Sequence, residues 1–361
     1  MRKAVIAAIA LLGVGSAYAQ TGSNSYVVAN LAADTAGVAS FIDPYLINPF
    51  GLTAPASKSI GEGEWWAANN GSGTSTLYYA DGSVTPLTVT IPAADGVSMG
   101  SPTGVVDISN NFIFVTLDGT LSQWTKNDKP STASSIAEMT PEMHRNSSQP
   151  CTNCHVTTAT LKYSSPTASY SGATTAYYQF KNTLFVANSN STSIQAFSAS
   201  TLAPVSLPAT AFVDPSIPAA FTPNNIQYAG GKIWIAYSNS TPSGGYVDGY
   251  STSGKLEVQL QQSGHLNDPW GIAIAPSNFG TFSGALLIGN TEAGNIAAFD
   301  AKKGTWLGNL QDGAGNDLSL PGLWALAFGT GNPDAGPTNV LYFTTGTANF
   351  MHGIFGSITA N

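Results

Sequence analysis

Asp268-Pro-Trp-Gly-Ile-Ala-Ile-Ala-Pro276 leads into a second apolar run, Leu286-Leu-Ile-Gly-Asn290, which a polar turn separates from Ile296-Ala-Ala-Phe299. Short runs of β-branched and aromatic residues, bounded by Gly, Pro and Asn, are typical of β-strands joined by tight turns. The stretch therefore predicts a lead-in strand followed by a β-hairpin.

This unit recurs six times along the chain. Its second strand begins at residues 65, 112, 184, 233, 286 and 341, so successive copies start 47, 72, 49, 53 and 55 residues apart. A period of about 50 residues with several short strands per unit is typical of the blades of a β-propeller. No long amphipathic helical pattern is present. We therefore predict an all-β fold, with one six-bladed β-propeller over residues 20–361.

One predicted strand lies outside the repeat. Tyr26-Val-Val-Ala-Asn-Leu31 precedes the first copy, whereas Ile354 to Ile358 belongs to the last. We expect these two segments to pair, because a ring closed in this way leaves no exposed sheet edge between the first and last blades.

Residues 1–19 have the pattern of a secretory signal peptide. Arg2 and Lys3 precede an apolar stretch from Ala4 to Val14, and Ala17-Tyr-Ala19 resembles a cleavage site. The apolar stretch is too short to span a bilayer. We therefore expect cleavage after Ala19 and export to the periplasm or the extracellular space, and we do not expect an integral membrane protein.

The chain is acidic and sparsely charged. Its formal net charge is −8, and charged residues make up 9% of the sequence. Loss of Arg2 and Lys3 with the signal peptide changes the charge from −8 to −10. Because no basic stripe is present to neutralise phosphates, the composition argues against a nucleic-acid partner. We expect a monomer.

The interval between the second and third copies, 72 residues, is the longest of the five. Residues 128–170 within it are rich in Ser, Thr, Pro and Ala and show neither a strand period nor a helix period over any length. Loops this long in a compact domain tend to be functional or disordered. We therefore predict a long irregular insertion between blades two and three.

The insertion carries both cysteines of the chain, in Cys151-Thr-Asn-Cys154-His155. This spacing is the attachment signature of c-type haem, in which two thiols bond to the porphyrin and the adjacent imidazole ligates iron. We expect one covalent haem c, with His155 as the proximal iron ligand and His144 or Met143 as the distal ligand. The expected role is single-electron transfer with a redox partner protein.

Other chemistries are open for the same residues. Cys151 and Cys154 could form a disulfide in an oxidising compartment, and the chain would then be a secreted binding propeller with a redox-sensitive staple. A zinc ion could take both thiols together with His155 and His144. However, Cys154 and His155 are adjacent and cannot easily both face one tetrahedral ion.

Polar residues recur where the predicted strands end or begin. In a propeller such positions can surround the axial channel, where they could bind a small ligand or a hard cation. The alternative, which we favour, is that Asn and Asp suit turn geometry at strand ends. The residues are Asn48, Asn69, Thr116, Asn188, Asn224, Asn225, Tyr237, Asn267, Asp268, Asn290 and Thr345.

Several segments together resemble a known family. They lie at residues 43–52, 66–78, 268–284, 322–329, 341–346 and 352–357. The chain resembles an uncharacterised family of secreted bacterial six-bladed β-propellers, which is similar to NHL-repeat and SMP-30-like proteins. The resemblance covers nearly all of the mature chain and implies the fold, but it implies no settled activity. The insertion departs from the family's usual pattern.

A calcium-dependent, lactonase-like hydrolase is a third class of function, with Asn and Asp oxygens as ligands at the axial channel. The sequence contains no nucleophile elbow, no HExxH and no phosphate-binding Gly loop. Asn48 also stands near the position where SMP-30-like proteins have a Glu. We therefore do not expect a hydrolase, and whether the chain is an enzyme is left open.

Overall fold

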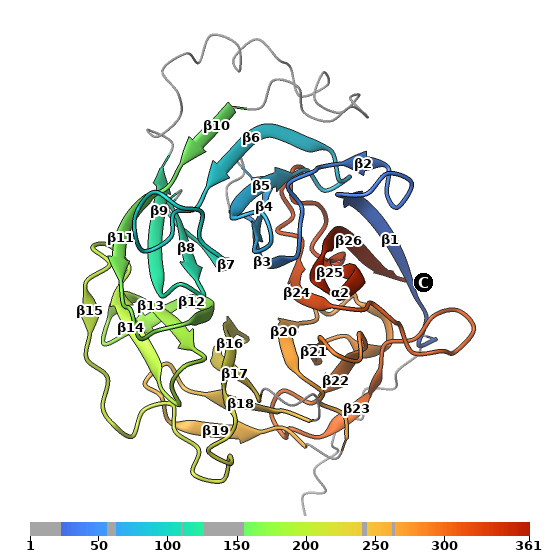
Figure 1. The fold of residues 1–361 in the computed structure, drawn as a ribbon. Coiled ribbons are helices and arrows are strands. Elements are labelled where there is room, and N and C mark those ends of the chain that lie inside the picture. The colour runs from blue at the N-terminus through green and yellow to red at the C-terminus, as the bar shows by residue number, and fades with distance from the viewer. Residues whose placement is uncertain (1–22, 56–62, 110, 126–154, 240–243, 262–263) are drawn as a thin grey trace, which may run out of the picture.

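Six sheets surround a central axis, and each sheet is one blade (Figure 1). The structure is a computed structural model that describes residues 23–55, 63–109, 111–125, 155–239, 244–261 and 264–361. All six predicted second strands are present as central strands of these sheets. The prediction of an all-β six-bladed propeller is confirmed.

The first three blades follow one another around the axis. From the axis outward, blade 1 contains β3 (Pro49–Thr53), β4 (Trp65–Asn69), β5 (Thr74–Tyr78), β6 (Val84–Thr90) and β10 (His155–Thr158). Blade 2 contains β7 (Pro102–Ile108), β8 (Asn111–Thr116), β9 (Thr120–Thr125) and β11 (Thr160–Ser164). Blade 3 contains β12 (Tyr170–Tyr178), β13 (Lys181–Asn188), β14 (Ile194–Ser198) and β15 (Pro204–Val205).

The other three blades complete the ring. Blade 4 contains β16 (Thr222–Ala229), β17 (Lys232–Ser238), β18 (Tyr246–Tyr250) and β19 (Leu256–Gln259). Blade 5 contains β20 (Pro269–Ile274), β21 (Leu286–Asn290), β22 (Ile296–Phe299) and β23 (Trp306–Asn309). Blade 6 contains β24 (Leu323–Phe328), β25 (Leu341–Gly346), β26 (His352–Ala360), β1 (Tyr26–Ala33) and β2 (Phe41–Ile42).

The ring closes as the sequence predicts. The N-terminal strand β1 lies antiparallel to the C-terminal strand β26, with Val28 opposite Ile358 and Ala33 opposite Ile354. Figure 1 shows the two strands side by side in the same blade, drawn in blue and red. The first and last segments of the described chain thus share one sheet.

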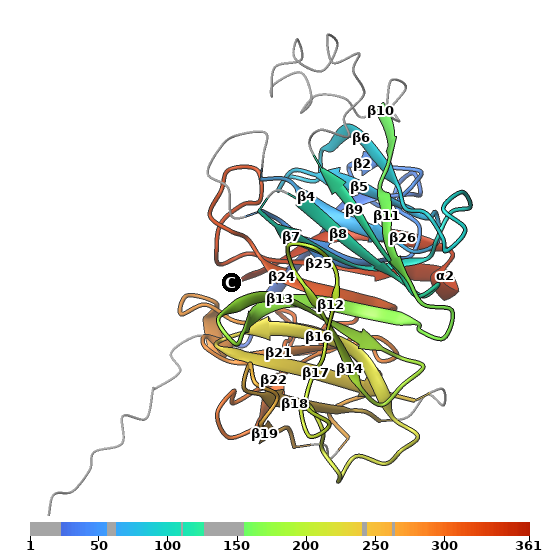
Figure 2. The same ribbon diagram turned by 90° about the vertical axis from the view of Figure 1, so that its left-hand side faces the viewer.

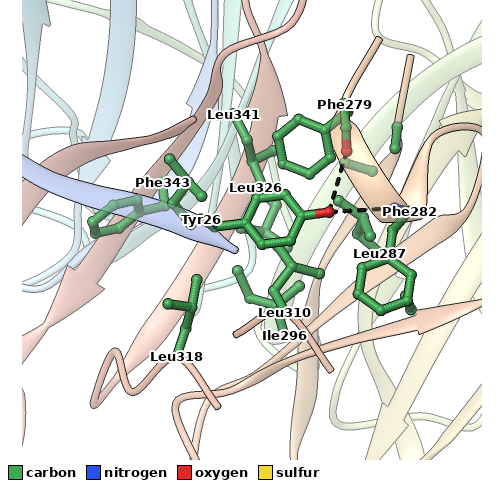
Figure 3. Close-up of a cluster of buried hydrophobic side chains, with 14 of the residues drawn as sticks. Tyr26, Phe279, Phe282, Leu287, Ile296, Leu310, Leu318, Leu326, Leu341 and Phe343 are labelled. Atoms are coloured by element: carbon green, nitrogen blue, oxygen red, sulfur yellow. Dashed lines mark hydrogen bonds between the residues drawn. The ribbon is translucent and has the colours of Figure 1, made fainter. Parts of the chain in front are cut away.

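The core lies between adjacent blades. Tyr26 of β1 is 2% exposed and packs among apolar side chains of blades 5 and 6 (Figure 3). Its hydroxyl donates a hydrogen bond to the carbonyl of Phe279 at 3.1 Å and accepts one from the N–H of Phe282 at 3.3 Å. A buried hydroxyl with two partners avoids the desolvation cost of an unpaired polar group. The closing strand is therefore fixed by packing as well as by its ladder with β26.

The prediction that residues 128–170 are irregular is wrong for the part from residue 155 to residue 164, which forms the two strands β10 and β11. β10 pairs in parallel with β6 of blade 1, and β11 pairs antiparallel with β9 of blade 2. Thr160–Ser164 alternates between exposed and half-buried side chains, as expected for a strand packed on one face. The chain leaves blade 2 after β9 and returns along the outer edge of blade 1 before it adds the outermost strand of blade 2 (Figure 2).

Helical structure in the described ranges is limited to short segments. They are the 3-10 turn η2 (Gly280–Phe282) and the four-residue α2 (Thr347–Phe350) between β25 and β26. Neither segment has the length or the hydrophobicity of a membrane span, and the described ranges contain no other helix.

Candidate functional site

Every innermost strand is interrupted by a β-bulge at the same place. The pairing register shifts one or two residues after each strand begins, in all six blades. A bulge bends the strand locally and changes the direction of a side chain, and bulges are frequent beside functional sites. The residues at the six bulges are Phe50, Thr103, Ser171, Asn224, Trp270 and Trp324. Because every bulge lies at the start of an innermost strand, these residues surround one mouth of the channel.

Three of the six bulge residues are aromatic and come from the consecutive blades 5, 6 and 1. The rings of Phe50 and Trp324 stack at 3.7 Å, and Trp270 meets both edge-on at 6.2 and 5.9 Å. Their exposed fractions are only 5 to 9%. We call Phe50, Trp270 and Trp324 the aromatic arc.

The other half of the mouth is polar, and its side chains hold neighbouring blades together. Thr103 donates to the carbonyl of Tyr170 at 2.6 Å, and Ser171 donates to the carbonyl of Pro223 at 3.1 Å. Comparable bonds run from Asn225, Thr291 and Thr344 to the next innermost strand, so the blade contacts repeat around the ring. Thr103 and Ser171 therefore have a structural role that uses their hydroxyl hydrogens.

The strand-end residues follow the turn geometry that we favoured. The side-chain oxygen of Asn188 accepts the N–H groups of Ser169 and Asn190, and that of Asn290 accepts the N–H of Asn267. Each Asn thereby fixes the segment that leads into its own blade. Tyr237 is likewise not a channel residue, because its hydroxyl bonds to that of Tyr250 in a buried cluster.

Amide side chains lie beside the aromatic arc. The Oδ1 of Asn48 accepts the indole N–H of Trp324 at 2.9 Å, while its Nδ2 reaches the Oδ1 of Asn70 only at 3.4 Å. The Nδ2 of Asn70 reaches the carbonyl of Pro102, also at 3.4 Å. Both distances exceed the usual range for N–H···O bonds. These two amides therefore have donor capacity that the fold uses weakly.

A carboxyl group lies at the blade 5 end of the aromatic arc, two residues before Trp270. Asp268 accepts a bond from the Nδ2 of Asn224 at 3.2 Å. Burial raises the pKa of Asp268, a hydrogen bond with Ser238 lowers it, and the nearby charge of Glu292 raises it further. The mouth thus combines amides, a partly buried carboxyl group and aromatic rings.

The channel below the aromatic arc is nearly filled. A cavity of about 40 Å³ is lined by small residues such as Gly51, Gly104, Ala173 and Ala325, with Asn225 and Trp270. This volume accommodates little more than one or two water molecules. A larger ligand could therefore bind only at the mouth.

The short segment α2 lies over this mouth. Figure 2 shows α2 at one face of the ring. Phe350 contacts the ring of Trp324, with 5.5 Å between ring centroids, and it is 42% exposed. A Cβ on Gly346 would touch Asn48, Phe350 and Trp324 together, so these three side chains converge. Ala348, Asn349 and Phe350 all have positive φ, between 49° and 65°, and such a run is costly for residues other than Gly.

Most of the residues predicted to attach haem or ligate its iron lie outside the described residues, namely Cys151, Cys154, His144 and Met143. The backbone of His155 is described, and it pairs with Leu87 at the start of β10. Two residues later, the hydroxyl of Thr157 accepts the indole N–H of Trp124 at 2.9 Å, and both side chains are buried. The end of the Cys-x-x-Cys-His segment is thereby attached to the outer rim of blades 1 and 2.

No group of three or more His, Cys, Asp or Glu side chains suitable for a metal ion occurs in the described part of the chain. Two carboxyl groups do meet, at Asp214 and Asp248 beside blade 4. Burial and the charge of Asp214 raise the pKa of Asp248 to about 8. Burial also raises the pKa of Asp214, but hydrogen bonds from Ser216 and Gln259 together lower it more, so the net shift is downward. One proton shared between the two carboxyl groups accounts for the opposite directions of the two pKa shifts.

No model of a known protein family matches the chain. It is 33% identical over 117 residues to the uncharacterized protein R640 of Acanthamoeba polyphaga mimivirus. This match covers 30% of this chain and 22% of R640. It is 30% identical over 152 residues to the uncharacterized protein R648 of the same virus. This match covers 39% of this chain and 36% of R648. The matches therefore span less than two fifths of these relatives.

Solved structures resemble the chain over most of its length. A glucose dehydrogenase aligns with a TM-score of 0.55 at 12% identity, over 93% of this chain and all of that one. A luciferin-regenerating enzyme aligns with a TM-score of 0.52 at 9% identity, over 88% and 92% of the two chains. A protein of unknown function from Bacteroides thetaiotaomicron aligns with a TM-score of 0.55 at 12% identity, over 93% of this chain and 76% of that one. At these identities the likeness shows the fold alone, so the class established is the six-bladed β-propeller.

Proposed function

We propose that this chain is an exported c-type haem protein that transfers single electrons, with the propeller as its scaffold. The observation that carries the proposal is Cys151-Thr-Asn-Cys154-His155, which contains every cysteine of the chain. Two thiols and an adjacent imidazole are the donor set that covalent haem requires. The signal-like residues 1–19 support delivery to a compartment where such attachment takes place.

The position of the described end of this segment also supports the proposal. β10 is the outermost strand of blade 1, and its Val156 is 56% exposed. A prosthetic group next to an outer edge needs no space inside the ring, and the nearly filled channel could not supply any. The buried bond between Trp124 and Thr157 fixes the backbone beside the motif. A bulky group can thus be held at the rim without disturbing the blades.

In this proposal Cys151 and Cys154 hold the porphyrin through thioether bonds, and His155 is the proximal ligand. His144 or Met143 is proposed as the distal ligand. Haem iron bound in this way supplies reversible one-electron chemistry, whose potential depends on the distal ligand and on solvent exposure. A rim site suits exchange with a redox partner protein, because the partner can approach without entering the ring.

The test is expression of the full chain in an exporting host that attaches haem. The purified protein should carry the mass of one haem, and its reduced spectrum should show Soret and α bands. Cys151→Ala combined with Cys154→Ala should abolish covalent haem, whereas Thr152→Ala between them should retain it.

Three results would overturn the proposal. A mass two units below that of the reduced apo chain identifies a disulfide and supports a secreted binding propeller. Bound zinc released by a chelator identifies a structural metal site. An apo chain with free thiols, matured in the same host, shows that the motif is not used for attachment.

A further inference from the structure

We infer that the mouth of the channel around the aromatic arc is a binding site for a neutral saccharide ring, and that Phe350 covers this site. The inference uses only described residues and stands whether or not haem is attached at the rim. It begins with the six bulges, which lie around one mouth.

The chemistry of the mouth matches a saccharide. A sugar ring has an apolar C–H face and a rim of hydroxyl groups, so its recognition needs an apolar surface beside hydrogen-bonding groups. Phe50, Trp270 and Trp324 are the apolar groups at the mouth; they are 5 to 9% exposed with Phe350 against Trp324, so Phe350 must move before a ligand contacts the Trp324 ring. Tryptophan combines large apolar area with little conformational entropy to lose, which favours it at binding sites.

The polar groups at the mouth have the right bonding capacity. The amide donors of Asn48 and Asn70 are engaged only at 3.4 Å, so a ligand hydroxyl oxygen at a better distance would improve their hydrogen bonding. Asp268 can accept from a ligand hydroxyl. The negative charges of Asp268 and Glu292 disfavour an anionic ligand, and they leave a neutral one unaffected.

The depth of the site limits how the ligand binds. The cavity below the aromatic arc is about 40 Å³, too small for a sugar. The ligand therefore rests on the mouth, where either a free monosaccharide or the end of a longer chain can be accommodated.

Phe350 occupies the space above Trp324 in the present conformation. It is held there by three consecutive residues in the left-handed region, Ala348, Asn349 and Phe350. Strained backbone of this kind is often found at ligand clamps. Because leaving this conformation relieves the strain, displacement of Phe350 by a ligand costs less than displacement of a relaxed side chain.

The test is isothermal titration calorimetry of the full chain with D-glucose, N-acetyl-D-glucosamine, cellotetraose and chitotetraose, together with saturation-transfer NMR. We expect saturable binding of at least one probe. Tighter binding of a tetraose than of its monosaccharide identifies a chain end, and equal binding identifies a free sugar.

Three variants locate the site. Phe350→Ala should tighten binding about five-fold, because the ligand no longer has to displace the covering ring. Asn70→Ala should weaken binding about five-fold through loss of one donor. Phe180→Ala is the control: Phe180 is likewise an exposed phenylalanine with positive φ, but it lies just beyond the far end of β12, and its removal should change nothing.

The inference fails if no probe gives saturable binding to the natural chain or to Phe350→Ala at about 20 mM. It also fails if Phe180→Ala alters binding as much as Phe350→Ala does. Unchanged or weaker binding by Phe350→Ala would show that Phe350 does not cover the site. Gain of affinity cannot arise from misfolding, so this variant decides the matter even if others are destabilised.

Discussion

The inner strands and the outermost strands of the blades obey different rules. The three inner strands are alike in all six blades, and they carry the bulges and the bonds from blade to blade. The fourth position varies: it is Pro204–Val205 in blade 3 but the eight residues of β1 in blade 6, where the short β2 follows as a fifth strand. Inner strands are enclosed by neighbours on both faces, whereas an outer strand needs only one ladder partner. Strand length and geometry are therefore constrained near the axis and can vary at the rim.

The largest effect should come from an exception to this comparison, the outer strand β1. Tyr26→Ala removes a side chain that is 2% exposed and packs into two blades. We expect the free energy of unfolding to fall by about 3 to 5 kcal/mol, as for other large-to-small core substitutions. Urea denaturation measures it, with Tyr45→Ala at a 38% exposed position as the control. A loss below about 1 kcal/mol would show that closure depends on the ladder alone.

Gly51→Ala tests the inner strands directly. A Cβ at Gly51 would lie 2.9 Å from the Cα of Gly104 and from the carbonyl oxygen of Thr103, and backbone atoms cannot move aside easily. We expect a loss of about 2 to 3 kcal/mol. Gly313→Ala at the rim meets only a Ser25 oxygen at 3.6 Å and should be nearly neutral. Equal effects of the two substitutions would contradict the distinction between axis and rim.

The carboxyl pair near blade 4 should make stability depend on pH. Because the pKa of Asp248 is raised to about 8, the folded state keeps a proton that the unfolded chain releases in mild acid. Stability from this group is thus present at low pH and is lost as the pH rises toward about 8. We expect a decline of about 1 to 2 kcal/mol between about pH 5 and about pH 8.

Asp248→Asn should flatten this decline, as thermal or urea unfolding at several pH values can measure. Glu257→Gln is a suitable control, since Glu257 pairs with Lys232 at the surface of the same blade. The groups facing Asp248 are Asp214 from the preceding connector and Tyr250 on its own strand, with Tyr237 behind Tyr250. A decline that persists in Asp248→Asn would assign the dependence to another group.

The smallest effect should come from the attachment of β10 to the rim. Thr157→Val removes the acceptor of the Trp124 indole N–H while keeping the size of the side chain. We expect a loss of about 1 kcal/mol, the usual effect of one buried hydrogen bond. Thr158→Val, at the exposed neighbouring position, should change stability little. If both variants behave alike in urea denaturation, the bond to Trp124 does not hold the strand.

The repeat made most of the fold predictable from sequence. Apolar runs such as Leu286–Asn290 recur at similar spacing, and Tyr26–Leu31 has no partner within its own unit, which indicated closure with the last blade. The strands β10 and β11 were missed because each is short and one is parallel, so neither forms a recognisable hairpin. Their β-branched residues, Val156, Thr157, Thr158 and Thr160, were the available signal.

The candidate site was predictable only in part. Asn48, Asn224 and Asp268 were named as possible channel residues, although turn geometry was favoured, and they lie at the mouth, whereas Asn188 and Asn290 fix the lead-in segments. The aromatic arc was not predicted. Its signal was an aromatic residue one position into the inner strand, in Pro49-Phe50, Pro269-Trp270 and Leu323-Trp324. Only the bulges give that position its direction, and a bulge cannot be recognised from residue types alone.

The consecutive strands β10 and β11 belong to two different blades, so one short stretch of polypeptide connects the outer edges of blade 1 and blade 2. If the chain were stretched from its two ends in an optical trap, this connection would carry force in both sheets at once. Blades 1 and 2 should then unfold in a single step, whereas the remaining blades should unfold one at a time.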